Sequence, residues 1–260
     1  MSDRNPELEL EIIAHRGYSA IAPENTLPAF ARAMEAGAHS IELDVQLSAD
    51  RVPMVFHDIT LERVARSPDR IEDLTREQLA DFDVGSWFAP EFASARISTL
   101  AEVLETLSDL EKTIYLDVKP HCTWSVEEID RLLELLDALG GLGRYVLCSF
   151  SRSFLDRARD RSGDITLGYS IHNAQTYPAQ FSRAATDGRA VTICEYRVLL
   201  ENPTWVETSR KEGVEPVVWT VDDRRDWHQL IDIGIRRIIT NALLPTALVG
   251  EPHDSRHEHS

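Results

Sequence analysis

The chain has 260 residues, 43% of them hydrophobic, so it can bury a large core. That length fits one α/β barrel, which takes about 250 residues. The formal net charge of -17, from 27 Lys and Arg against 44 Asp and Glu, excludes nucleic acid and anionic membranes as partners held by bulk electrostatics. Any phosphate site in such a chain must therefore be locally positive.

Neither an apolar N-terminal segment nor a run of membrane-spanning length is present. The three cysteines, Cys122, Cys148 and Cys194, form no disulfide framework and no zinc pattern, and the last two lie in apolar runs typical of a core. We therefore expect a cytoplasmic protein without stable membrane anchoring. The polar, His-rich tail at residues 251–260 is expected to be disordered, and the oligomeric state is left open.

The chain begins with a strand and a helix. An apolar run at residues 12–14 predicts a short strand that ends at His15 and Arg16. The sequence Pro-Glu-Asn-Thr at residues 23–26 precedes apolar residues at helical spacing, which predicts a helix start. Asn25 has no titratable proton, so we expect it to support a site, with helix capping as its ordinary use.

A hairpin follows the helix. The second strand is predicted over residues 40–45, and the chain returns through residues 52–56. This connection is too short for a parallel crossover, so the return arm must be antiparallel. Glu42 and Asp44 are two residues apart and leave the same face of the strand. The position of the turn predicts that Asp44 lies opposite His57.

Residues 59–96 interrupt the alternation of strands and helices. We interpret them as an insertion, and an insertion of this length within a compact domain usually has a function. It contains four aromatic residues that form either an apolar mouth or, as we prefer, a small core of its own: Phe82, Trp87, Phe88 and Phe92.

Regular alternation then resumes to the C-terminus. With the first arm of the hairpin counted once, eight strands are predicted, near residues 12, 41, 114, 146, 167, 192, 217 and 238. Alternating strands and helices give a parallel sheet, and eight strands indicate a closed (β/α)8 TIM barrel, here one domain over residues 1–250. An open doubly wound sheet is the alternative, but no Gly-rich dinucleotide fingerprint supports it.

Polar residues fall where these predicted strands end, which is where barrel enzymes place their catalytic groups. They are His15, Glu42, Asp44, Asp117, Lys119 and Trp219. Three converging carboxylates without a nearby cysteine, those of Glu42, Asp44 and Asp117, favour one hard divalent cation, Mg²⁺ or Ca²⁺. A single acid of this kind would more often pair with a surface base.

Two histidines flank this acidic cluster. Cleavage of an anionic ester needs one proton removed and one delivered, and His15 and His57 are suited to these roles because histidine titrates near neutral pH. The sequence does not decide which is the acid and which the base. Arg16 and Lys119 can bind the phosphate oxygens and at the same time balance the charge of the acids.

The stretch from residue 12 to residue 58 resembles the glycerophosphodiester phosphodiesterase family. The motifs that carry the resemblance occur in the family's order and spacing: His15-Arg16-Gly17, Pro23-Glu24-Asn25-Thr26, Glu42-x-Asp44 and His57-Asp58. The resemblance implies metal-dependent hydrolysis of a small glycerophosphodiester to glycerol 3-phosphate and an alcohol. It also implies that the free 2-hydroxyl of glycerol attacks phosphorus and that water then opens a cyclic phosphate.

The resemblance further implies that Trp219 packs against the glycerol carbons and that the insertion covers part of the site. A core aromatic at the barrel rim is an equally good interpretation of Trp219. The chain has Asp117 where the family usually has Glu, and Asn241 where Asp is frequent. Glu195 is a further candidate acid, or a partner in a helix-facing pair.

Two other functions stay open at this level. A related phosphodiesterase could act on a lysophospholipid or a sugar phosphodiester. A catalytically silent phosphate-binding protein could use the same fold, because a fold alone does not establish chemistry. The full set of histidines, acids and Lys119 argues against the silent protein.

Overall fold

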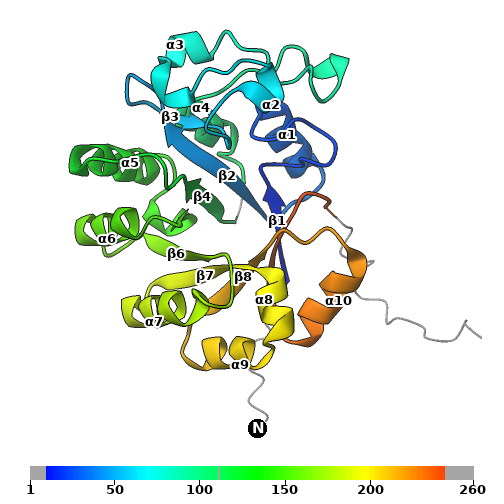
Figure 1. The fold of residues 1–260 in the computed structure, drawn as a ribbon, viewed down its shortest axis with the longest axis vertical. Helices are drawn as coiled ribbons and strands as arrows, with labels where there is room; N and C mark the ends of the chain where they lie inside the picture. The colour runs from blue at the N-terminus through cyan, green and yellow to red at the C-terminus, as the bar shows by residue number, and fades with distance from the viewer. Residues whose placement is uncertain (1–9, 111, 244–260) are drawn as a thin grey trace, which may run out of the picture.

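The computed structural model describes residues 10–110 and 112–243. Eight parallel strands form a closed barrel: β1 (Glu11–His15), β2 (Ser40–Leu47), β4 (Ile114–Val118), β5 (Tyr145–Ser149), β6 (Thr166–Ile171), β7 (Ala190–Glu195), β8 (Glu215–Trp219) and β9 (Arg237–Thr240). Parallel pairing of β1 with both β2 and β9 closes the barrel (Figure 1). The predicted (β/α)8 barrel is confirmed, whereas the tail at 251–260 lies outside the described residues.

Helices surround the barrel (Figure 1): α1 (Leu27–Glu35), α4 (Leu100–Thr106), α5 (Val126–Ala138), α6 (Arg152–Arg161), α7 (Tyr177–Asp187), α8 (Tyr196–Glu201), α9 (Thr204–Lys211) and α10 (Arg224–Asp232). Local sequence explains where several begin. Thr99 and Ser125 each form a capping box with a glutamate three residues later, which satisfies backbone N–H groups at the starts of α4 and α5.

The sequence did not predict α8. The strand predicted near residue 192 ends at Glu195, and the Glu195 side chain accepts hydrogen bonds from the backbone N–H groups of Arg197 and Val198. Glu195 is therefore the N-cap of α8, and it does not line the cavity described below. A glutamate is an uncommon cap, which is why its local role was not recognised.

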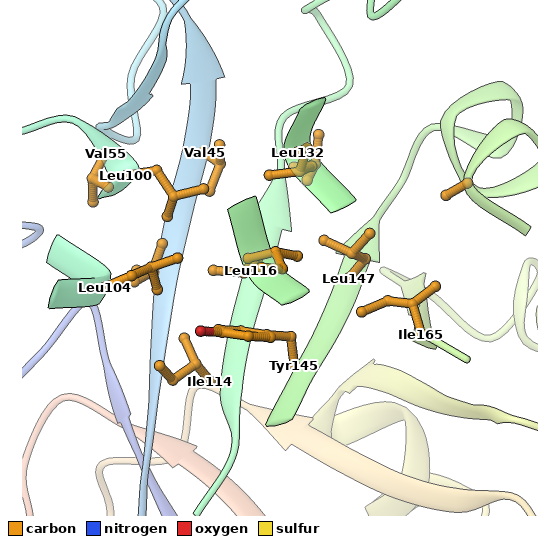
Figure 2. Packing of buried hydrophobic residues seen from close by; sticks show 14 of the residues in the cluster. Val45, Val55, Leu100, Leu104, Ile114, Leu116, Leu132, Tyr145, Leu147 and Ile165 are labelled. Carbon is orange, nitrogen blue, oxygen red and sulfur yellow. The ribbon is translucent and has the colours of Figure 1, made fainter. Parts of the chain in front are cut away.

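The two faces of the strands bury different cores. Outward residues such as Val45, Leu116 and Leu147 pack against the surrounding helices (Figure 2). Inward residues fill the barrel itself: Ile13, Tyr115, Val146, Cys148, Val191, Ile193, Val217 and Ile239. Because side chains alternate along a strand, His15 continues the inward register of Ile13, and Asp117 that of Tyr115. The alternation of side chains along each strand thus places polar residues at the C-terminal end of the barrel, next to its apolar interior.

The hairpin register differs from our prediction by one residue. Strand β3 (Pro53–Val55) is antiparallel to β2 and pairs Val55 with Val45. Asp44 therefore lies opposite Phe56, whose backbone N–H donates to the Asp44 carbonyl at 3.1 Å, and not opposite His57. The Ser48 N–H donates to the Val52 carbonyl at 3.1 Å, which leaves an odd-numbered loop at residues 49–51 and shifts the pairing.

The insertion contains the short helices α2 (Glu62–Ala65), η1 (Ile71–Asp73), α3 (Arg76–Leu79) and η2 (Pro90–Phe92). Its apolar residues form a separate small core with the hairpin: Met54, Phe56, Leu61, Val64, Ile71, Leu79, Val84 and Ile97, against which Phe82 packs. Phe88 contacts Trp87 and Phe92 edge to face, each with ring centroids 5.7 Å apart. These aromatic residues pack within the insertion and do not form the mouth of the barrel cavity.

Candidate active site

A cavity of about 230 Å³ opens at the C-terminal ends of the strands. All eight residues to which the sequence assigned catalytic, binding or metal roles line it: His15, Arg16, Glu42, Asp44, His57, Asp117, Lys119 and Trp219. The further candidate acid, Glu195, does not. Sequence reasoning missed the remaining lining residues, which are Cys148, Phe150, Ser170, His172, Ile193 and Ile239. Extending the inward period of two along β5 and β6 would have found Phe150, Ser170 and His172.

The three acids converge as predicted. One carboxylate oxygen from each of Glu42, Asp44 and Asp117 lies within 4.8 Å of the others. Strand pairing explains this, because Asp44 and Asp117 are register partners on β2 and β4. Burial raises the pKa of Glu42 well above its usual value, and the charges of Asp44 and Asp117 raise it further. Three carboxylates this close repel one another when they are ionised, and a bound cation would remove that repulsion.

These acids fit a divalent cation on a second observation. The Oδ1 atom of Asp117 is buried and has no hydrogen-bond partner among the described residues. A buried, unpaired carboxylate oxygen is costly unless something satisfies it. Hard divalent cations are bound by oxygen ligands, and the unpaired Oδ1 atom of Asp117 is free to act as one.

Lys119 is the cation nearest to the cluster. Its Nζ atom lies 2.5 Å from Oδ1 of Asp44 and 2.7 Å from Oδ2 of Asp117. Burial opposes the charged ammonium, but the two carboxylates outweigh it and raise the pKa of Lys119. Lys119 is therefore a permanent positive charge beside the acids.

Arg16 is held by its backbone as well as its side chain. It has a left-handed φ of 56°, and its backbone N–H lies 3.1 Å from Oε2 of Glu42. Its Nη1 donates to Oε1 of Glu24 at 2.7 Å. Its Nε lies 3.0 Å from Oδ2 of Asp44 but is not aligned to donate a hydrogen bond, so this contact is an ion pair.

Glycine is required after Arg16. Gly17 has a φ of 82°, and a Cβ atom at this position would lie 2.7 Å from the backbone of Ala29 in α1. The turn therefore brings β1 close to α1 and directs the Arg16 side chain over the acids. The His-Arg-Gly motif thus has a steric reason in this chain.

Asn25 supports the site in a different way from the one expected. The residue that caps α1 is Thr26, whose side chain accepts from the N–H of Ala29. Asn25 instead donates from Nδ2 to Oδ2 of Asp44 at 2.6 Å and accepts from the Asp44 backbone N–H at 3.2 Å. This two-way contact fixes Asp44, so the supporting role is confirmed and the capping role is wrong.

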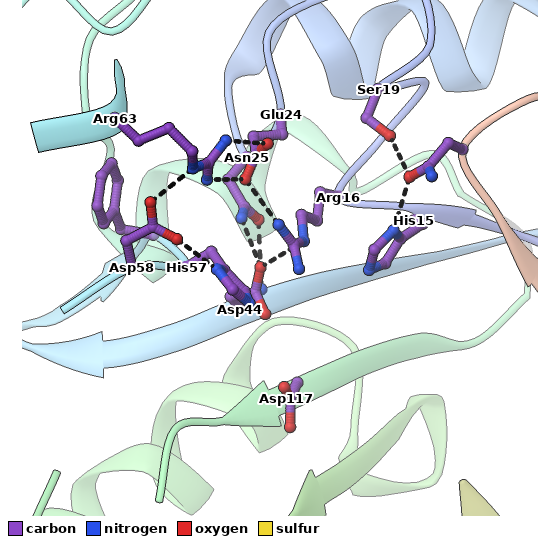
Figure 3. Close-up of polar contacts among 12 residues, drawn as sticks. His15, Arg16, Ser19, Glu24, Asn25, Asp44, His57, Asp58, Arg63 and Asp117 are labelled. Carbon is purple, nitrogen blue, oxygen red and sulfur yellow. Dashed lines mark hydrogen bonds and ion pairs between the residues drawn. The ribbon is translucent and has the colours of Figure 1, made fainter. Parts of the chain in front are cut away.

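His57 belongs to a chain of charges that reaches into the insertion. Its Nδ1 lies 2.6 Å from Oδ1 of Asp58, and Arg63 donates to Oδ2 of Asp58 at 2.6 Å (Figure 3). Arg63 also donates two hydrogen bonds of 2.8 Å to Glu24, the partner of Arg16. Bonds from His57 and Arg63 outweigh the effect of burial and hold the pKa of Asp58 below its usual value. The insertion thus braces the site without lining the cavity.

His15 has a neutral partner. Its Nδ1 lies 2.7 Å from Oδ1 of Asn241, and the Asn241 amide is oriented by its donation from Nδ2 to Oδ2 of Asp222 at 2.7 Å (Figure 3 draws the first contact). The Nε2 atom lies 3.8 Å from Oε2 of Glu42. Burial first, and then the charge of Arg16, lower the pKa of His15 to about 4. This imidazole is neutral at pH 7.

Trp219 forms the opposite wall of the cavity. Its ring stacks on His172, with centroids 5.9 Å apart and planes at 27°, and meets Phe150 edge to face at 6.2 Å. Its indole N–H donates to the carbonyl of Ile193 at 3.2 Å, which fixes the ring plane. Trp219 therefore presents a rigid apolar surface across from the charged groups.

Comparison with known proteins places this site in a family. The model of the glycerophosphoryl diester phosphodiesterase family matches residues 15–244. The chain belongs to this family. A glycerophosphodiester phosphodiesterase of Caldanaerobacter subterraneus is 31% identical over 230 residues, covering 88% of this chain and 93% of that protein.

Solved structures of glycerophosphodiester phosphodiesterase family members agree with the observed fold. An Oleispira antarctica phosphodiesterase, solved in complex with the product sn-glycerol-3-phosphate, superposes with a TM-score of 0.81 at 27% identity, covering 89% of this chain and 92% of that one. A glycerophosphodiester phosphodiesterase from Agrobacterium tumefaciens gives a TM-score of 0.78 at 26% identity, covering 92% and 98%. Among the helices of the described residues, none has the length and apolar character needed to cross a membrane.

Proposed function

We propose that this protein hydrolyses glycerophosphodiesters to glycerol 3-phosphate and an alcohol, with residues 1–250 acting as one catalytic domain. The observation that carries the proposal is that one cavity brings together His15 and His57, three carboxylates and two permanent cations. Family membership supports the reaction class, and the product complex of the Oleispira relative supports a small glycerophosphate ligand.

The charged side of the cavity would hold the phosphate. Glu42, Asp44 and Asp117 would bind one divalent cation, for which oxygen ligands favour Mg²⁺ or Ca²⁺. When bound, that cation would stabilise negative charge on the phosphoryl oxygens and lower the pKa of a coordinated hydroxyl. Arg16 and Lys119 would contact the same oxygens as fixed positive groups in a buried setting, where each is worth more than in water.

The two histidines have different partners, and this supports different roles. Both present Nδ1 to an oxygen acceptor, so Nδ1 carries the proton in the neutral ring and Nε2 faces the cavity. His15 bonds a neutral amide, which favours the neutral, proton-accepting ring. His57 instead bonds the negatively charged carboxylate of Asp58, which orients the ring. We therefore assign the general base to His15 and the general acid to His57.

In the first step Nε2 of His15 would take the proton of the glycerol 2-hydroxyl while that oxygen attacks phosphorus. His57 would deliver its Nε2 proton to the leaving alcohol oxygen, and a cyclic phosphate would remain. In the second step water would open the ring, with its proton passing to His57 and the His15 proton returning to the 2-hydroxyl oxygen. Both histidines would then be restored to their starting forms.

The leaving group offers a direct test of these roles. p-Nitrophenolate is a weak base and leaves without being protonated. The choline oxygen is a strongly basic alkoxide and must receive a proton as it leaves. In the first step, the His57→Ala protein should release choline from glycerophosphocholine about 10²- to 10⁴-fold more slowly than wild type, but release of p-nitrophenol from glycerophospho-p-nitrophenol should slow far less. Opening of the cyclic phosphate should slow equally for both substrates, because that step uses His57 as the base. The His15→Ala protein should lose activity on both, because removal of the 2-hydroxyl proton does not depend on the leaving group.

The reverse pattern, with His15→Ala rescued by p-nitrophenol, would exchange the two roles. Near wild-type turnover in either variant would remove that histidine from the mechanism. Folding of each variant can be verified by thermal denaturation, and release of glycerol 3-phosphate and alcohol can be quantified separately.

A further inference from the structure

The wall of the cavity opposite the charged groups is almost entirely apolar. Within the part of the chain that the structure describes, its lining there comes from Cys148, Phe150, Ile193, Trp219 and Ile239, together with two polar residues, Ser170 and His172. Glycerol carries hydroxyl groups, and a hydroxyl taken from water without a partner costs free energy. Two polar side chains on an otherwise apolar wall are therefore the groups available to a polar part of the ligand.

Both residues project inward from the same edge of the barrel. Gly168, Ser170 and His172 share one face, because side chains alternate along β6 and its extension. A Cβ atom at Gly168 would lie 2.6 Å from Sγ of Cys148, so β6 packs closely against β5 below the cavity. Ser170 is the register partner of Ile193 on β7 and is only 3% exposed.

The polar atoms of these two side chains are not used by the protein. Within residues 10–110 and 112–243, the Ser170 hydroxyl and the His172 imidazole make no hydrogen bond to another described group, although the Ser170 carbonyl accepts one from Gln180 at 3.4 Å. His172 is held by ring contacts alone, stacked on Trp219 and edge to face with Phe150 at 6.3 Å. Stacking orients the imidazole and leaves its nitrogen atoms available for a ligand.

We propose that Ser170 and His172 bind the free primary hydroxyl of the substrate glycerol and so determine specificity for it. This inference rests on the proposed function, which places the phosphate at Arg16 and Lys119 and the 2-hydroxyl at His15. The glycerol carbons then lie along Trp219, and the remaining terminal hydroxyl points toward β6. Ser170 can donate and accept, and His172 can complete the pair from the rim.

This pair would separate two substrate classes that share the same reactive atoms. A glycerophosphodiester presents the primary hydroxyl free, whereas a lysophospholipid carries an acyl ester on it. A site with donors and acceptors for a hydroxyl discriminates strongly against analogues that cannot pair with them, because its own polar groups are left unsatisfied. The chain is thus directed toward deacylated glycerophosphodiesters, although its wall is otherwise apolar enough for a lipid.

The test compares glycerophosphoethanolamine with 2-hydroxypropyl phosphoethanolamine, which retains the attacking hydroxyl and lacks the primary one. The wild-type protein should favour the first by about tenfold or more in kcat/KM. Ser170→Ala and His172→Phe should bring this ratio close to one, mainly by slowing the glycerol substrate. His172→Gln, which keeps a donor and an acceptor, should retain part of the preference. Ile239→Val is the matched control, because it alters the same apolar lining away from the ring contacts that hold His172 and should leave the ratio unchanged.

Binding of the products supplies an independent measurement. By calorimetry, glycerol 3-phosphate should bind the wild-type protein more tightly than 2-hydroxypropyl phosphate, and Ser170→Ala and His172→Phe should remove the difference. A wild-type ratio near one, or variants that slow both substrates equally, would overturn the inference and leave the proposed function intact. If the wild-type protein hydrolyses neither diester, the proposed function fails, and the product-binding ratio then decides the hydroxyl site by itself.

Discussion

His15 and Asn241 are hydrogen bonded at 2.7 Å, although 226 residues separate them in the chain. Closure of the barrel makes this contact possible, because β1 and β9 are neighbours and both residues stand at strand ends. Donation by Asn241 to Asp222 fixes the carbonyl oxygen toward His15, which places the proton on Nδ1 and turns Nε2 toward Glu42. The orientation of a reactive imidazole is thus set by the last strand.

Exchanging the partners of this contact should change how His15 titrates. In an Asp222→Asn/Asn241→Asp protein the hydrogen bond between the two positions is kept, but a carboxylate now faces the imidazole. The pKa of His15 should rise from about 4, because an adjacent negative charge stabilises the protonated ring. The acidic limb of the pH–rate profile should move to higher pH with it.

NMR titration of the imidazole in the exchanged protein measures this pKa directly. The Asn241→Asp single variant is the control. It replaces the amide that lies 2.7 Å from the Asp222 carboxylate with a second carboxylate, and repulsion between the two charges should lower the melting temperature. An unchanged His15 titration in a folded double variant would show that Asn241 does not set the charge state of His15.

Arg63 should affect catalysis through Asp58 and His57, although it lies in the insertion. The Arg63→Gln substitution removes the guanidinium, and with it one of the two hydrogen bonds that hold the Asp58 carboxylate. We expect kcat on glycerophosphocholine to fall about tenfold, in the lower range for loss of a group that orients a catalytic partner. Release of p-nitrophenol from glycerophospho-p-nitrophenol should proceed at close to the wild-type rate, because this leaving group needs no acid.

Arg70→Gln provides the comparison for Arg63→Gln. Arg70 is an exposed insertion arginine that pairs with Glu72, and surface pairs of this kind contribute little. Equal losses on both substrates in Arg63→Gln would indicate general damage to the insertion and not an effect transmitted to His57.

Without a cation, repulsion within the acidic cluster should lower the free energy of unfolding of the wild-type protein. Burial and the charges of Asp44 and Asp117 raise the pKa of Glu42, so the ionised form that exists at pH 7 in the unfolded chain is disfavoured in the folded one. Glu42→Gln should therefore raise the melting temperature in EDTA, by an amount equivalent to about 1 kcal/mol or more. Thermal scans with and without Mg²⁺ or Ca²⁺ measure the effect.

The same substitution should abolish stabilisation by the cation. Wild-type protein should gain stability as cation is added, as ligand binding to the native state requires, while Glu42→Gln should not respond. A lower melting temperature for Glu42→Gln in EDTA would mean that the Glu42 carboxylate stabilises the fold by itself.

Arg51 and Glu128 should give a pH-dependent contribution to stability away from the site. Arg51 ends the hairpin loop with a φ of 61°, and its guanidinium bonds Glu128 in α5 at 2.5 and 2.8 Å. That hydrogen bond, more than any other factor, lowers the pKa of Glu128 from 4.5 to about 2. Stability from this pair is present above pH 4.5 and is lost as the pH falls toward 2.

Arg51→Gly is the variant that separates the two effects. It should destabilise the protein at pH 7 through loss of the pair, while relieving a left-handed backbone cost of about 1 kcal/mol. Urea unfolding at pH 7 and at pH 3.5 should show a smaller difference from wild type at the lower pH. A difference that is constant with pH would mean that the pair contributes no stability.

The barrel was predictable because its strands carry short apolar runs at regular spacing and its caps, such as Ser125, are standard ones. The polar side of the site was predictable because His15, Asp44 and Asp117 stand at strand ends within recognisable motifs. The hairpin register was not, since one loop residue decides it and Arg51 occupies a backbone conformation usually given to glycine.

Contacts between distant segments were also beyond sequence reasoning. Arg63 reaches Glu24 across 39 residues, and no local pattern marks either as a partner of the other. Ser170 and His172 lie outside any motif that the sequence singled out, and only the inward register of β6 brings them to the cavity. For Glu195 the sequence left two interpretations, a site acid and a helix-facing pair, and the structure shows the second, because Glu195 caps α8 and pairs with Arg197 of that helix at 3.1 Å.

The most direct measurement is release of glycerol 3-phosphate from glycerophosphocholine and glycerophosphoethanolamine, first in EDTA and then with Mg²⁺ or Ca²⁺ restored. We predict no release in EDTA, recovery with at least one of the two cations, and no recovery in the Asp117→Asn protein. A folded wild-type protein that releases no glycerol 3-phosphate with either cation, or releases it equally well in EDTA, would contradict the account.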